Sequence, residues 1–172
     1  MDAPTERQFD VPVQQRTAKD PVKLLDNARK WASKITGLMI AGVGMLCFVT
    51  RAGIGSGPNL SCTVLYLGLM HLLSVRGKLG SAFHLLLDNT VAENKCNTMI
   101  YFLAWLVAKD YFHQASFFCM LVGHTYSRID QSFNTLISQL MSKPIWTVRL
   151  LVSYITQYLR PYNCLGTTEL VI

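Results

Sequence analysis

Histidines are the first residues of this chain whose type and spacing could do chemistry, because they bind metals and haem. His113 and His124 lie on one face of a helix, roughly 16 Å apart. That is too far for one metal ion but suits two haems stacked across a membrane, if a second helix carries a similar pair. His71 and His84 have such a spacing, but Arg76 and a glycine-containing basic stretch lie between them. The four are candidate haem ligands, and packed or interfacial histidines are the alternative that we expect.

The five cysteines show no paired spacing, and two of them lie inside apolar stretches. This pattern is typical of small hydrophobic residues in a reducing compartment. The segment AGIGSGPN lacks the Gly-Lys-Ser/Thr of a phosphate-binding loop. The sequence contains no serine-centred nucleophile elbow, no pair of carboxylates in an apolar helix and no cluster of metal ligands. It therefore predicts a protein that is not an enzyme and that binds no cofactor, metal or small-molecule substrate.

The elements that would position these residues are apolar. The chain has 172 residues, of which 51% are hydrophobic and 15% are charged, and its mean hydropathy is +0.27. Its uncharged runs cover residues 35–50, 52–75, 96–108 and 111–127. Such a composition is more apolar than that of a typical soluble domain. We therefore expect an all-α, multi-pass helical membrane protein with interfacial amphipathic helices. It has four spans if Lys109-Asp110 is a turn, as we favour, and otherwise three.

The first uncharged run would make a short span. Its sixteen residues give a helix of roughly 24 Å, against about 30 Å of bilayer hydrocarbon. Lys34 and Arg51 could close the gap by extending their aliphatic stems to the head groups. A buried core helix is the alternative. Small residues that would let a second helix approach this span lie along one side of it: Ser33, Gly37, Ala41 and Gly44.

The remaining segments divide the chain into a flexible arm (1–20), a single helical membrane domain (21–160) and a tail (161–172). Helical patterns of apolar and polar residues occur in three segments: from Pro21 onward, over residues 129–141 and over residues 145–160. Residues 81–94 form a further short amphipathic stretch. Basic and tryptophan side chains are expected at the membrane interface: Lys30, Trp31, Lys34, Arg51, Arg76, Lys78, Trp146, Arg149 and Arg160.

The net charge of +6 comes largely from the arm and the loops. We therefore expect anionic lipid head groups as the partner of these charges, and no nucleic acid. Other membrane proteins would bind through the transmembrane and amphipathic helices.

One family resemblance rests on Ala82-Phe83, Glu93 to Cys96, Tyr101 to Leu103, and Thr125-Tyr126 ahead of Arg128. In this order of segments, over residues 22–130, the chain resembles the transmembrane protein thirty-three and yeast pore-membrane protein family. That family is usually longer at its C-terminus. The resemblance implies a non-enzymatic scaffold or membrane-shaping protein of the endoplasmic reticulum and nuclear envelope, acting with reticulon-like partners.

Two other functions remain open. Small basic multi-pass proteins also serve as accessory structural subunits of respiratory or ATP-synthase complexes in the mitochondrial inner membrane. A haem- or quinone-binding membrane anchor is the third possibility, using His71 or His84. Localisation in reticular or in mitochondrial membranes would separate the first two.

Overall fold

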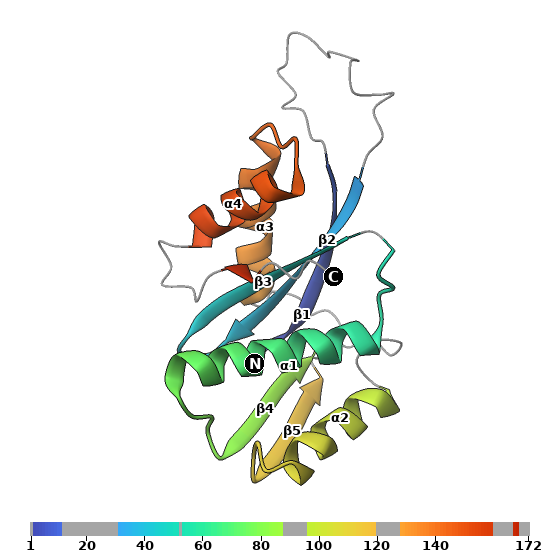
Figure 1. Cartoon of the computed structure of the whole chain (residues 1–172), viewed down its shortest axis with the longest axis vertical. Coiled ribbons are helices and arrows are strands. Elements are labelled where there is room, and N and C mark those ends of the chain that lie inside the picture. The colour runs from blue at the N-terminus through green and yellow to red at the C-terminus, as the bar shows by residue number, and fades with distance from the viewer. Residues whose placement is uncertain are drawn as a thin grey trace.

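The computed structural model describes residues 2–11, 31–51, 53–87, 96–119, 128–159 and 167–168. The described strands and helices follow one another along the chain (Figure 1) in the order β1 (Asp2–Val11), β2 (Trp31–Ile40), β3 (Gly44–Arg51), α1 (Pro58–Arg76), β4 (Ala82–Leu87), α2 (Asn97–Ala108), β5 (Gln114–Cys119), α3 (Arg128–Met141), α4 (Val148–Leu159) and β6 (Thr167–Thr168). The fold is therefore mixed α/β. The prediction of an all-α, multi-pass membrane protein is wrong.

The strands form a six-stranded sheet in the order β5-β4-β1-β2-β3-β6. β1, β2 and β3 are antiparallel neighbours, whereas β4 runs parallel to β1 and β5 runs parallel to β4. Asp2 lies opposite Leu86 where β1 and β4 meet. The β4–β5 pair thus extends the sheet beyond the first strand (Figure 1).

The first predicted span is a β-hairpin. Residues 41–43 form the turn, in which the Val43 amide donates to the Ile40 carbonyl at 3.0 Å and Gly42 has a φ of 71°. The register pairs Lys34 with Thr50, so Lys34 and Arg51 lie on adjacent strands rather than at opposite ends of a helix. Lys34 Nζ donates to the Ile54 carbonyl at 3.3 Å.

Burial on both faces of the sheet explains why the sequence of this hairpin predicted a membrane span. Successive residues of β2 and β3 point alternately into two separate hydrophobic cores. The core under α1 and α2, here called the first core, includes Leu38, Leu46 and Phe48. The core under α3 and α4, here called the second core, includes Ile35, Met45 and Val49. A strand buried on both faces has a continuous apolar sequence, and periodicity alone cannot distinguish it from a buried helix.

The second uncharged run does contain a helix, α1, which packs in the first core. Pro58 stands in the first turn of α1, and Gly77 ends it with a φ of 73° while its amide donates to the Leu73 carbonyl at 2.7 Å. α1 is the one helix among the described residues that is long and apolar enough to cross a membrane. Leu65 and Leu69 are fully buried inside the protein, which accounts for part of the apolar character of α1.

The break predicted at Lys109-Asp110 is confirmed, although it does not separate two spans. α2 ends at Ala108, and Asp110 adopts a φ of 58° in the turn that follows. The chain then enters β5 as an extended strand. A parallel pair such as β4 and β5 needs a crossover connection, and the segment containing α2 provides it.

The helix predicted at residues 129–141 is observed as α3, and Phe133 and Leu136 on its apolar face are fully buried in the second core. α4 likewise buries Leu151 and Ile155 there. Both amphipathic helices therefore cover a sheet of their own chain (Figure 1).

Three further segments differ from the expectation because they form strands of the sheet. Residues 2–11, placed in the flexible arm, form β1, and residues 82–87 of the expected amphipathic stretch form β4. Residues 31–35, where the first amphipathic helix was expected to end, belong to β2, while residues 21–30 lie outside the described ranges.

The small residues expected on one side of a helix lie in the hairpin. Ala41 is exposed in the turn, and Gly44 begins β3. Ser33 and Gly37 are buried on β2. Gly37 does permit a close approach, but the group that approaches it is the Phe133 ring of α3.

Candidate functional site

The candidate haem ligands lie on separate elements. His71 is partly buried in α1, His84 is exposed on β4, and His113 is exposed just before β5. His124 is outside the described residues. Across the ranges that the structure describes, no three His, Cys, Asp or Glu side chains form a group that could hold a metal ion.

The expected interfacial residues occupy strand ends, turns and helix surfaces. Arg51 is exposed at the end of β3, and Arg76 Nη2 donates to the Gly42 carbonyl at 3.2 Å, which ties α1 to the hairpin turn. Lys78 and Arg149 are exposed, and Trp146 is 53% exposed. Trp31 begins β2, whereas Lys30 and Arg160 lie outside the described residues. Their role at a membrane stays a prediction.

Cys62 and Cys96 come close together between α1 and the start of α2. Burial, followed by the effect of the neighbouring Cys96 thiol, raises the pKa of Cys62 to about 11 from an ordinary 9.0. The thiolate is the nucleophile of a cysteine, so little reactive Cys62 exists at neutral pH.

We therefore expect iodoacetamide at pH 8 to modify Cys62 about tenfold more slowly in the folded chain than in the same chain unfolded in urea. The lower thiolate population is partly offset by the greater nucleophilicity of a high-pKa thiolate. Mass spectrometry of the peptide that carries Cys62 measures both rates. Equal rates in the two states would contradict this account of its surroundings.

An acidic residue of the sequence stands at the junction of β1 and β4. Asp2, the first residue of β1, is the register partner of Leu86, and β4 ends one residue later at Leu87. The next residue in the sequence is Asp88. In sheets with parallel strands, ligands commonly bind beyond the carboxyl ends of those strands, and the end of β4 is such a position.

Register also assigns this junction to one face of the sheet. Asp2 pairs with Met39, which packs against the second core, and residues opposite each other on antiparallel strands share a face. Leu85 and Leu87 belong to the first core, so Leu86 lies on the opposite face. The positions of Asp2 and Leu86 are therefore both on the face that carries α3 and α4.

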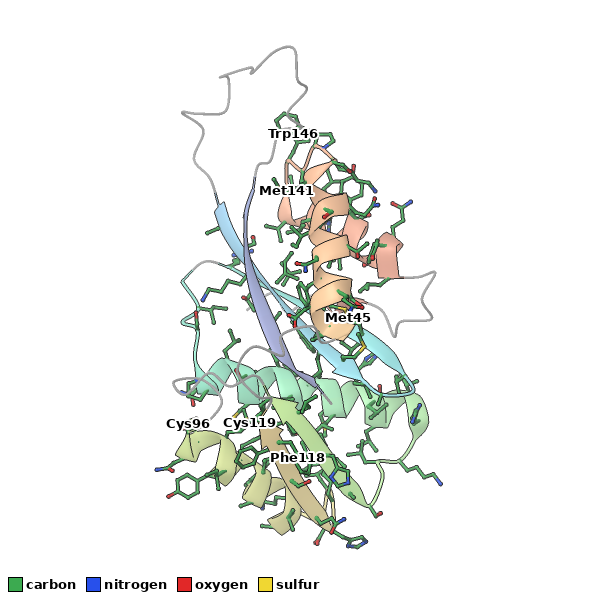
Figure 2. The ribbon with its side chains drawn as sticks, turned by 180° about the vertical axis from the view of Figure 1, so that it is seen from behind. Met45, Cys96, Phe118, Cys119, Met141 and Trp146 are labelled. Atoms are coloured by element: carbon green, nitrogen blue, oxygen red, sulfur yellow. The ribbon has the colours of Figure 1, made fainter. Side chains whose placement is uncertain are left out.

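α3 brings a further carboxylate to this face. Asp130 lies in its first turn, where the helix dipole stabilises a negative charge. Ile129 is buried beside it, and Phe133, one turn later, packs over Gly37 of β2. In Figure 2 the N-terminal end of α3 lies against the central strands near Met45, and α3 contacts both β1 and β2.

The arrangement thus gathers acidic positions from three segments that are far apart in the sequence. Carboxylate oxygens are the ligands preferred by Mg²⁺ and Mn²⁺. Asp130 is the member whose surroundings the structure describes; for Asp2 it describes the backbone, and Asp88 lies outside the described residues.

Sequence reasoning missed this site because it looked for paired carboxylates within one apolar helix. Two signals were nevertheless available. Asp88 directly follows the run HLLL, and Asp130 lies in the first turn of the amphipathic helix α3. An acidic residue that directly follows a buried strand is a candidate site residue, because ligands commonly bind beyond the carboxyl ends of strands. This signal can be used only after the apolar run has been identified as a strand.

Comparison with known proteins identifies a family without an assigned activity. Residues 23–169 match the family described as "Domain of unknown function (DUF7869)", so the chain belongs to that family. No curated protein and no solved structure matches the chain. The resemblance to the pore-membrane protein family therefore stays a prediction.

Proposed function

We propose that this member of the DUF7869 family is a metal-dependent phosphoryl-transfer enzyme that cuts or joins nucleic-acid strands. Asp2, Asp88 and Asp130 are its proposed catalytic carboxylates. The observation that carries the proposal is the pairing of Asp2 with Leu86, on the face of the sheet to which α3 contributes Asp130. This pairing puts the start of β1 beside the end of β4, where the chain continues to Asp88.

The topology supports this proposal. Three antiparallel strands are followed by two strands parallel to the first, in the order β3-β2-β1-β4-β5. In sheets with parallel strands, ligands commonly bind beyond the carboxyl ends of those strands, and the end of β4 is such a position. A fold can serve several functions, so the positions of the acidic residues weigh more than the topology.

The donor set fits a hard divalent cation. Asp2, Asp88 and Asp130 offer oxygen ligands only, and such ligands suit Mg²⁺ or Mn²⁺ better than zinc or copper. When bound, the cation would supply Lewis-acid stabilisation of the charge on a phosphate. The three carboxylates would hold it at the β1–β4 junction. The excess of 16 basic over 10 acidic residues, for which we expected lipid head groups and no nucleic acid as the partner, suits a polyanionic substrate equally well.

The membrane-scaffold function was inferred from several spans. Since the first of those runs is a hairpin and the amphipathic helices pack on the sheet, the inference loses its structural premise. α1 remains as the observation that could favour it. Extraction of the expressed protein with alkaline carbonate tests that function, because a scaffold with several spans would stay in the pellet.

The proposed enzyme is tested by metal removal. The full chain, incubated with end-labelled single- and double-stranded oligonucleotides, should cleave or join strands in Mg²⁺ or Mn²⁺. EDTA should stop the reaction, and excess Mg²⁺ should restore it, because carboxylates alone do not stabilise charge on a phosphate. Gel electrophoresis of the products measures the rate. A chain that is inactive on DNA, RNA and hybrid duplexes with both metals, or whose activity survives EDTA, would refute the proposal.

A further inference from the structure

Among the described residues, no helix packs over the β4–β5 part of the sheet on the face that carries the proposed site. α3 and α4 pack over β1, β2 and β3, whereas the β4–β5 pair lies beyond them (Figure 2). Phe118 is 58% exposed there, and His84 is exposed as well. The opposite face of β4 is buried in the first core through Phe83 and Leu85. Exposure is thus confined to one side of this strand pair.

Four side chains on this side of the strand pair form a group, here called the open face: His84 and Leu86 on β4, and Ser116 and Phe118 on β5. His84 and Phe118 are exposed, and Leu86 and Ser116 are partly buried. His84 is the register partner of Ser116, and its Nδ1 lies 2.7 Å from Ser116 Oγ. Leu86 is the register partner of Phe118, and the rings of His84 and Phe118 have centroids 6.5 Å apart. The open face therefore combines hydrogen-bonding groups with an exposed aromatic ring.

The open face continues toward the proposed site. Along β4 it runs from His84 to Leu86, and Leu86 is the residue opposite Asp2. Each residue along a strand advances about 3.3 Å, so His84 lies roughly 7 Å along β4 from Leu86. A polymer bound at the carboxylates could extend over this face without crossing α3.

Two basic residues stand in the turns that lead into this strand pair, Lys78 before β4 and Lys109 before β5. In residues 53–87 and 96–119, which include α1, β4, α2 and β5, the basic residues are Arg76, Lys78 and Lys109, and the one acidic residue is Asp110. An apolar protein segment would match Leu86 and Phe118. It would not match the His84 imidazole, the Ser116 hydroxyl or the excess of basic over acidic residues. A nucleic-acid strand matches all of them, since its bases stack on aromatic rings and its phosphates accept hydrogen bonds.

We propose that the open face binds a single-stranded polynucleotide leading into the carboxylate site, with Phe118 stacking on a base and His84 with Ser116 contacting the backbone. This inference rests on the proposed function, because that function supplies the polymer. DNA and RNA share the chemistry that the open face recognises, so both serve as probes.

Binding is measured separately from catalysis. Fluorescence anisotropy of labelled oligo-deoxythymidylate and oligo-uridylate, with the full chain in EDTA, gives the Kd of each probe. Phe118→Ala should raise the Kd of at least one probe about tenfold, as expected for the loss of one base–aromatic stack. Phe118→Trp should keep the affinity and show quenching of its fluorescence when the oligonucleotide binds.

Tyr101→Ala is the matched control. Tyr101 is 71% exposed on α2, which covers the opposite face of β4 and β5, so its removal should leave both Kd values unchanged. Thermal melting checks that all three variants are folded. An unchanged Kd for Phe118→Ala, an equal loss for Tyr101→Ala, or no binding of either probe by the unmodified chain would overturn the proposal.

The two proposals fail in different ways. If the chain cleaves nucleic acid while Phe118→Ala changes neither Kd nor KM, the open face is wrong and the enzyme stands. If Phe118→Ala weakens binding but the unmodified chain cleaves nothing, the binding face stands and the enzyme is wrong. When both hold, Phe118→Ala raises KM by the factor found for Kd and leaves kcat unchanged.

Discussion

Replacement of Asp130 by Asn is expected to slow nucleic-acid cleavage by at least about a thousandfold, since metal-assisted charge stabilisation contributes several kcal/mol to catalysis. Asn keeps the size of the side chain and its place in the first turn of α3, but it removes the negative charge that would hold a divalent cation. Single-turnover rates over a Mg²⁺ titration measure the effect.

Asp110→Asn controls for the loss of one negative charge. Asp110 is exposed in the turn after α2 with a φ of 58°, a conformation that Asn also tolerates. This variant should cleave at the rate of the unmodified chain. Far-ultraviolet circular dichroism and melting temperature establish whether Asp130→Asn is folded. Activity of folded Asp130→Asn within tenfold of the unmodified chain would remove Asp130 from the catalytic carboxylates.

Replacement of Gly37 by Ala is expected to reduce the free energy of unfolding by about 2–3 kcal/mol, the upper part of the range for overpacked cores. A Cβ at this position would overlap the Phe133 ring and lie 2.7 Å from Met45 Cε. Phe133 is fully buried between α3 and the sheet, so it cannot move aside without shifting the helix. Urea denaturation measures the change.

Two further variants show whether this overlap is the cause. Ala41→Ser changes a small residue in the exposed turn of the same hairpin and should alter stability by less than about 0.5 kcal/mol. Phe133→Leu combined with Gly37→Ala should be more stable than the sum of the two single changes predicts, because the smaller side chain makes room for the methyl group. Strict additivity would show that Gly37 does not face Phe133.

The helices were the part of the fold that local sequence patterns could predict. Leu136 and Leu140 recur at the helical period and lie on the buried face of α3, and Gly77 ends α1 as a glycine with positive φ. Capping, period and breaks act over a few residues. They therefore leave a readable signal even when the surroundings of a helix are misassigned, as happened when a bilayer was expected around α1.

The sheet left no comparable signal. Residues 35–50 are apolar because β2 and β3 are buried on both faces, and a membrane span is apolar because lipid surrounds it. Both environments select the same residue types. The turn at Gly42 was the local clue, but Gly37 and Gly44 nearby also fit the small-residue pattern of packed membrane helices.

Composition and local pattern determined where this chain is apolar and where the amphipathic helices α3 and α4 run and stop. Tertiary structure alone decided that the first apolar run pairs as two strands and that the start of β1, the end of β4 and the first turn of α3 share one face. Strand register joins Asp2 to Leu86 across more than eighty residues, and no local preference records such a pairing. The proposed site exists only through these long-range contacts, because each acidic residue by itself is an ordinary polar residue at the end of an element.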